Sequence, residues 1–189
     1  MVHDAGVARA GFGPAWPAID ATLRAGGGAL AFAVLVGDVA ATVARLRSRG
    51  VGVEDEQTGS VQQPNGSTVS WALAFLSEGP AWAPFFINYG ASVDEWRTSF
   101  QGPGFPIDPW SLDRIVVEVS EPAADAGWLA GVLGLSVSEA GQDAVGVALP
   151  GCTITFVHGP ANRPTGVVLT GVDAPVGEVA GLRFLGGSP

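Results

Sequence analysis

The chain has 189 residues, of which 47% are hydrophobic and 14% charged, so it is not a disordered chain and can bury the core of one large domain or two small modules. Its net charge is -9, all nine cationic residues are arginines, and no basic run occurs, which makes nucleic acid and anionic membrane surfaces poor partners.

The sequence favours a cytoplasmic location. The N-terminus has no basic segment followed by an apolar one, so no signal peptide is predicted. The longest apolar run, residues 29–36, is too short to span a bilayer as a helix. The single cysteine, Cys152, has no partner for an internal disulfide, and no neighbouring base marks it as a catalytic thiol.

Residues 1–28 are predicted to be an N-terminal segment with one short helix. Trp16, Ile19 and Leu23 recur at helical spacing, and the glycines at 26–28 end the pattern.

Residues 29–90 are predicted to form a first strand–helix–three-strand unit. Residues 29–36 are apolar throughout, which is typical of a strand covered on both faces. Asp38 suits a helix N-cap and Gly50 the position after the helix end, so a helix is predicted between them, followed by a strand at 51–56.

A hairpin completes this unit. Pro64, Asn65 and Gly66 provide the backbone angles of a tight turn. The sequence predicts strands on either side of this turn, the second centred on Trp71, and a further strand at 85–89.

Residues 91–111 mix Gly, Pro and isolated aromatics without periodicity and are predicted to be a linker. Residues 112–189 are predicted to form a second unit of the same kind with extra C-terminal strands. Its helix begins near Pro122 and ends at Gly134. Its predicted strands are 115–119, 135–137, 144–149, 153–158, 167–170 and 182–184.

The second unit repeats the first. Glu121 follows Asp38 by 83 residues and Gly134 follows Gly50 by 84, so both helix ends recur at nearly one offset. Two βαβββ copies in tandem are the simplest description, and the period is too long for a solenoid.

The repeat resembles the vicinal oxygen chelate superfamily, which includes glyoxalases, bleomycin-resistance proteins and extradiol dioxygenases, and more narrowly the actinobacterial glyoxalase-like domain proteins. Residues 34–49, 59–66, 71–75 and 84–87 carry the resemblance, and it extends more weakly over 112–170. It implies an α+β fold in which two βαβββ modules form a curved, largely antiparallel sheet around a cleft, with the helices on the outer face.

Many members of this superfamily bind a divalent metal in the cleft, through a His on each first strand and a Glu on each fourth strand. The family's spacing, counted back from the two helix caps, lands on Ala31 and Arg114. The fourth-strand positions carry Asn88 and either Val157 or His158. Alanine and arginine cannot ligate a cation, so no metal site of the family type and no cofactor are expected.

Other departures from the family weaken the polar chemistry of the cleft. Relatives carry charged residues on the hairpin arm, where this chain has Val61, Gln63, Asn65, Ser70 and Ala72. The family also usually opens with a half-module that precedes residue 29. Without it, we expect either that the two copies close on each other or that a homodimer completes the sheet.

Three charged or titratable residues are candidates for chemistry, each with a simpler alternative. Glu118 interrupts an apolar strand and is either an acid or base in the cleft or a solvent-facing edge residue. His158 is either a general base or a surface histidine at a strand end. Arg114 either binds a carboxylate or phosphate of a ligand or pairs with Asp113 or Glu121.

Aromatic residues suggest the wall of a ligand site. Asn88 and Tyr89 would provide hydrogen bonds beside Trp71, Phe86 and Phe32, and small-molecule sites are usually apolar with few polar anchors. The same aromatics could form ordinary core, and this is the favoured interpretation for Phe32.

The sequence therefore predicts a glyoxalase-like protein that binds a small apolar or aromatic molecule without a metal. One alternative is a metal-independent isomerase or lyase of secondary metabolism that uses Glu118 or His158 as acid or base. Others are a metal-dependent lyase or dioxygenase and a structural module that acts through oligomerisation.

Overall fold

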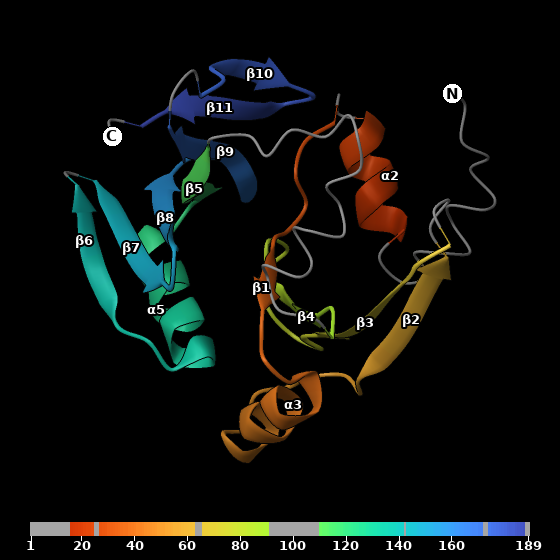
Figure 1. Cartoon of the computed structure of the whole chain (residues 1–189). Helices are drawn as coiled ribbons and strands as arrows, with labels where there is room; N and C mark the ends of the chain where they lie inside the picture. Colours follow the sequence, from red (N-terminus) through yellow and green to blue (C-terminus); the bar gives the residue numbers. More distant parts are fainter. Residues whose placement is uncertain are drawn as a thin grey trace.

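The computed structural model describes residues 16–24, 27–62, 66–90, 110–141, 143–171 and 174–187. The predicted mixed α+β fold is confirmed: there are two sheets of mixed strand orientation, and one helix covers part of each (Figure 1). In the described residues, no helix has the length and apolar character needed to cross a membrane.

The first sheet has four strands in the order β1-β4-β3-β2. β1 and β4 are parallel, and the other neighbours are antiparallel. The elements up to this point are α2 (Trp16–Arg24), β1 (Ala33–Leu35), α3 (Val39–Ser48), β2 (Gln57–Gln62), β3 (Thr68–Phe75) and β4 (Phe85–Asn88). Asp38 caps α3 as predicted, because its Oδ1 accepts the backbone N–H of Ala41 at 2.8 Å.

The second sheet has seven strands in the order β10-β11-β9-β5-β8-β7-β6. Its elements are β5 (Ser111–Val119), α5 (Pro122–Leu133), β6 (Val137–Gly141), β7 (Ala144–Leu149), β8 (Cys152–His158), β9 (Arg163–Thr170), β10 (Gly177–Val179) and β11 (Leu182–Gly186). α5 begins with the predicted proline and ends at Gly134, whose φ of 75° is left-handed.

The strand order of the first sheet recurs in the second. The strands β5-β8-β7-β6 repeat β1-β4-β3-β2, and in both cases the first and fourth strands are parallel. The order then begins a third time, because β9, β11 and β10 lie as the first, fourth and third strands of such a unit. β9 pairs antiparallel with β5, so two first strands lie side by side in one continuous sheet.

Two strand predictions in the first unit were wrong in their bounds. The strand predicted at 51–56 is reduced to an isolated bridge between Val53 and Leu76. Val53 packs into the core under α3, and the true strand β2 follows it, in a polar stretch. The strand predicted at 29–36 is only three residues long, and Phe32, just before it, packs in the core of the second unit.

Two other predicted features fall largely outside the described residues. These are the linker at 91–111, of which only the last two residues are described, and the turn at 64–66, of which only Gly66 is described. Gly66 has a φ of 86°, a conformation that glycine adopts without strain.

Trp82, in the loop between β3 and β4, joins the two halves of the molecule. Its side chain is fully buried, and its Nε1–H donates to Asp125 Oδ1 of α5 at 3.1 Å. Its ring lies edge-on to Trp128 and Phe156, with centroid separations of 5.4 and 4.9 Å. Phe32 belongs to the same cluster, so the first unit inserts two aromatic side chains into the core beneath α5.

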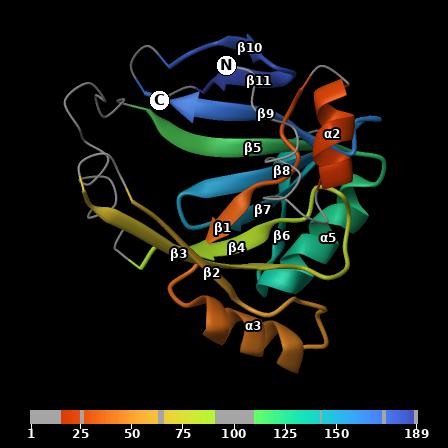
Figure 2. The same cartoon turned by 90° about the vertical axis from the view of Figure 1, so that its right-hand side faces the viewer.

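α3 and α5 form the second connection. Arg49 Nη2 donates to the carbonyl of Gly131 at 2.6 Å, and Arg45 Nη1 reaches the carbonyl of Leu133 at 3.4 Å. α5 has no basic residue in its own last turn, so α3 provides the positive charge that its C-terminal end favours. Since Val132 of α5 also packs under α3, the first sheet lies on the α5 side of the second sheet (Figures 1 and 2).

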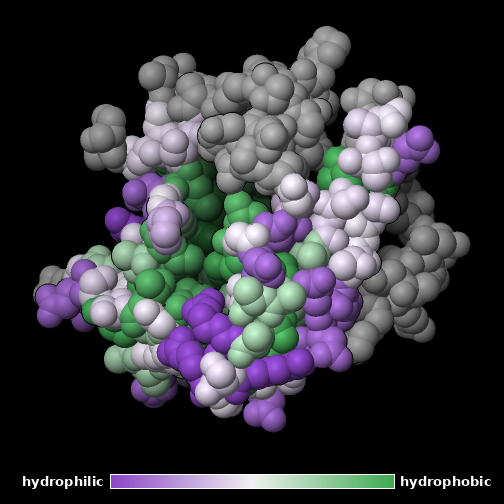
Figure 3. Space-filling view, turned by 60° about the horizontal axis from the view of Figure 1, so that its bottom comes forward, coloured by the Kyte–Doolittle hydropathy of each residue, from purple (hydrophilic) through white to green (hydrophobic). Residues whose placement is uncertain are grey.

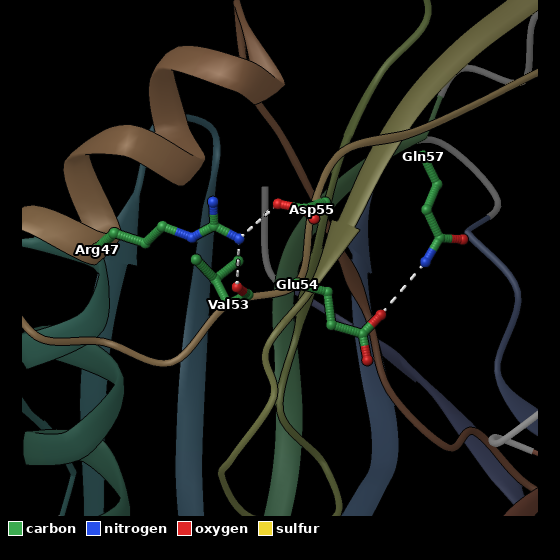
Figure 4. A network of polar contacts seen from close by, with 5 residues as sticks. All are labelled: Arg47, Val53, Glu54, Asp55 and Gln57. Carbon is green, nitrogen blue, oxygen red and sulfur yellow. Dashed lines mark hydrogen bonds and ion pairs between the residues drawn. The ribbon is translucent and has the colours of Figure 1, made fainter.

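A polar network holds the segment between α3 and β2. Arg47 Nη2 donates to the carbonyl of Val53 at 3.0 Å and to Asp55 Oδ1 at 2.8 Å, and Gln57 Nε2 donates to Glu54 Oε2 at 3.2 Å (Figure 4). These side chains are solvent-exposed, and hydrophilic side chains gather over this part of the surface (Figure 3). Exposed ion pairs add only about 0–1 kcal/mol each, so the network orders the segment more than it stabilises the fold.

Replacing Trp82 by Ala should lower the free energy of unfolding by about 3–5 kcal/mol, because it empties a buried aromatic site. Trp82→Phe, which keeps the apolar ring but leaves Asp125 without its donor, should cost about 1–3 kcal/mol. Denaturant unfolding measures both, with Val176→Ala at a 75% exposed valine as the control. A loss below about 1 kcal/mol for Trp82→Ala would contradict the joining role.

Replacing either of two glycines by alanine, one within α5 and one at its C-terminal end, should change the stability of the protein in opposite directions. Gly134→Ala places a Cβ at a left-handed φ, 3.0 Å from Arg49 Nη1, and should cost about 1–2 kcal/mol. Gly127 lies inside the helix with open space around it, so Gly127→Ala should stabilise by up to about 1 kcal/mol. Melting temperatures that move together in these variants would show that the cap geometry is not as described.

Candidate functional site

Each sheet has one face against its helix and one face that we call the open face. In the second sheet, Val117, Val147, Ile154 and Phe156 lie in the core beneath α5. Side chains alternate along a strand, so their neighbours point to the opposite face. The open face of the second sheet therefore carries Arg114, Val116, Glu118, Ala144, Gly146, Ala148, Thr153, Thr155 and Val157.

The open face of the first sheet, opposite α3, is apolar. The rings of Phe75 and Phe85 lie 5.4 Å apart, and Phe75 remains 38% exposed. Leu35 on β1 is 54% exposed. The half-buried indole of Trp71 lies over Gly59 of β2, where an added Cβ would come within 2.6 Å of the ring. Glycine at this position lets the indole lie flat against the neighbouring strand.

The open face of the second sheet carries two buried polar atoms without a hydrogen-bond partner. They are Nε of Arg114 and Oγ1 of Thr155. Thr155 is only 3% exposed, whereas the Arg114 side chain is 42% exposed and its Nη2 lies 3.8 Å from Asp113 Oδ2. Arg114 pairs directly with Thr153, so Thr155 is its diagonal neighbour on β8.

Glu118 lies on this same face and holds the turn after β8. Its Oε1 accepts the backbone N–H of Ala161 at 3.3 Å. The carboxylate also lies directly against Gly159, where any side chain would displace it. The described contacts of Glu118 are therefore with the turn between β8 and β9.

His158 points to the other face of the sheet. Its Nδ1 lies 3.1 Å from the carbonyl of Ser120, and because a carbonyl only accepts, Nδ1 must carry the hydrogen. His158 shares its side of β8 with Phe156, on the α5 face, whereas Glu118 lies on the open face. The structure therefore does not bring these two candidate catalytic residues together.

Asn88 occupies the place in the first unit that His158 occupies in the second. Its Nδ2 donates to the carbonyls of Val36 at 2.6 Å and Gly37 at 3.1 Å. Both side chains thus tie the end of a fourth strand to the turn that precedes the helix. This shared position gives each of them a structural role that sequence spacing did not reveal.

These contacts bear on the metal site that the superfamily resemblance implies. The implied positions carry Ala31, Arg114, Asn88 and Val157 or His158, and the side chains of Asn88 and His158 are directed at backbone carbonyls. No group of three or more His, Cys, Asp and Glu side chains in the described parts of the chain could hold a metal ion. The residues at these positions therefore do not fit a divalent cation.

The other predicted ligand-binding residues are distributed over different surroundings. Phe86 is 1% exposed and packs beneath α3, away from the open face. Tyr89 follows β4 and is half-buried. Trp71 lies on the open face of the first sheet and Arg114 on that of the second.

Two further features lie mainly outside the open faces. A broad, shallow depression of about 600 Å³ surrounds the start of α5, lined in part by Pro122, Glu139, Asp143 and His158. Burial raises the pKa of the Cys152 thiol, and nearby Asp113 raises it further, although a backbone hydrogen bond from Ile115 opposes the shift. The thiol therefore stays protonated at neutral pH and is a weak nucleophile.

Sequence reasoning missed Thr155, Phe75 and Phe85 as residues of these surfaces. The alternation in β8, where Ile154 and Phe156 flank Thr155, was a usable signal, because it places a hydroxyl opposite the core side of an apolar strand. No comparable signal distinguishes Phe85 from Phe86, since only the strand pairing shows which of the two faces α3.

One of the solved structures that align with this chain supports the fold. A hypothetical protein from Staphylococcus aureus aligns with a TM-score of 0.67 and 15% identity, over 82% of this chain and 64% of that one. A triple mutant of 4-hydroxymandelate synthase from Streptomyces coelicolor aligns with a TM-score of 0.49 and 12% identity, over 79% and 51%. This chain thus spans less than two thirds of either structure. A search of curated proteins gives no match.

A family model described as a glyoxalase-like domain matches residues 3–133, which is more than half of the chain and ends at the last residue of α5. This match confirms the resemblance drawn from the repeat. The chain belongs to the glyoxalase-like domain family.

Proposed function

We propose that the protein binds a small apolar or aromatic molecule on the open face of the first sheet, with Trp71 as its main contact. The observation that carries this proposal is the exposure of apolar strand residues on that face, above all Leu35 at 54% and Phe75 at 38%. Contiguous exposed apolar surface often marks a binding site, because leaving it in water is unfavourable.

The shape of this surface supports a flat ligand. Phe75 and Phe85 lie side by side on neighbouring strands, and Trp71 lies on the same face of β3. An aromatic molecule placed here would contact rings whose positions are fixed by strand pairing, which limits the entropy lost on binding.

The family supports a small-molecule role only in general terms, because family membership does not determine a reaction. Binding requires no metal, in keeping with the residues at the implied ligand positions. No described contact favours Glu118 or His158 as an acid or base, so the isomerase or lyase remains an untested alternative. The cleft shared by two modules and the homodimer likewise remain predictions.

Replacing Trp71 by Ala should abolish the rise in melting temperature that a bound neutral aromatic compound produces, because the largest contact is removed. Affinity should fall at least about tenfold, whereas Trp71→Phe should retain part of it. A thermal-shift screen against a panel of neutral aromatic metabolites measures this, with each variant compared with its own ligand-free melting temperature.

Val176→Ala, at an exposed apolar residue on the C-terminal segment, serves as the control and should leave every shift unchanged. Ligand-induced shifts that survive intact in Trp71→Ala would place the binding site elsewhere.

A further inference from the structure

We propose that the open face of the second sheet holds a separate site for a small organic monocarboxylate, in which the guanidinium of Arg114 binds the carboxylate and the hydroxyl of Thr155 adds a hydrogen bond. This site shares no residue with the surface around Trp71, because Arg114 and Thr155 lie on the second sheet and Trp71 lies on the first.

The first argument is the state of the two polar atoms. Nε of Arg114 and Oγ1 of Thr155 are both buried, and neither has a hydrogen-bond partner. Folded proteins satisfy nearly all buried polar groups, because a group that leaves water without a new partner loses its hydrogen bonds uncompensated. Two such groups lie at diagonal positions on neighbouring strands. We infer that a ligand supplies the hydrogen-bond partners that the protein lacks.

The second argument is the chemistry of the donors. Nε–H of a guanidinium lies beside one of its terminal amino groups, and the pair matches the two oxygens of a carboxylate. Asp113 lies 3.8 Å from Nη2, which is too far for a hydrogen bond, so it balances charge without occupying these donors. The threonine hydroxyl donates to or accepts from the same group.

The surroundings limit the size and charge of the ligand. On this face Arg114 lies between Thr153 and Val168 on the two adjacent strands, and Val116 follows it along β5. The Arg114 side chain is 42% exposed, so a ligand can reach its guanidinium from solvent. One arginine, with Asp113 near it and the Glu118 carboxylate farther along the same face of β5, suits a single negative charge better than a phosphate dianion.

The test uses benzoate and its neutral isostere benzamide, measured by thermal shift and by titration calorimetry in the Trp71→Ala background, which removes aromatic binding on the first sheet. Benzoate should raise the melting temperature and benzamide should not. Arg114→Gln should weaken the binding of benzoate at least about tenfold, and Arg114→Lys should retain part of the affinity. Arg183→Gln, at a β11 arginine hydrogen-bonded to Thr165, is the control and should leave the benzoate affinity unchanged.

Thr155→Val separates a binding role from a structural one. A hydroxyl that has no partner in the folded protein stabilises nothing, so the ligand-free melting temperature should stay the same or rise. Benzoate affinity should nevertheless fall severalfold. A lower melting temperature with unchanged benzoate affinity would mean that Thr155 is structural and would overturn its assignment to the site.

Three results would overturn the proposal as a whole. They are equal binding of benzamide and benzoate, benzoate binding that survives Arg114→Gln, and the absence of any benzoate-dependent shift. Tighter binding of inorganic phosphate than of benzoate at Arg114 would overturn the carboxylate class. Each of these outcomes is read in the Trp71→Ala background, so failure of the function proposed for the first sheet leaves this test unaffected.

Discussion

The orientation of the two halves depends on the burial of Trp82 beneath α5. The indole occupies a position in the second core that no residue of the second unit fills, and its N–H is matched by Asp125. Because this tryptophan comes from the loop before β4, it fixes the first sheet on the α5 side of the second. The arginines of α3 that bind the C-terminal carbonyls of α5 strengthen the same arrangement.

One result of this arrangement is that the molecule presents two surfaces with different chemistry. The face around Trp71 is apolar and offers ring contacts, whereas the face around Arg114 combines a cation with a buried hydroxyl. Because different residues make up the two surfaces, a ligand of each type can be sought independently.

The sequence was informative where local chemistry determines structure, as at the Asp38 cap, the α5 boundaries and strand β7, which has the predicted bounds. It was uninformative where the outcome depends on distant contacts. Trp82 lies in a Pro- and Gly-rich stretch without periodicity, so nothing local marked it as core. Asn88 and His158 looked like site residues because their spacing was visible, whereas the backbone carbonyls that they bind become neighbours only after folding. Alternation along β8 could have marked Thr155 as a residue opposite the core, but only the pairing of β5 with β8 places it diagonally beside Arg114.

The position of β5 within the seven-stranded sheet has a consequence for Arg114. β5 is paired along its length with β8 on one side and β9 on the other, so its backbone is held by two ladders. Such a strand cannot shift to admit a ligand, and the anion site is in this sense preorganised. The conformational entropy lost on association is then confined to one arginine side chain, which favours recognition of very small molecules.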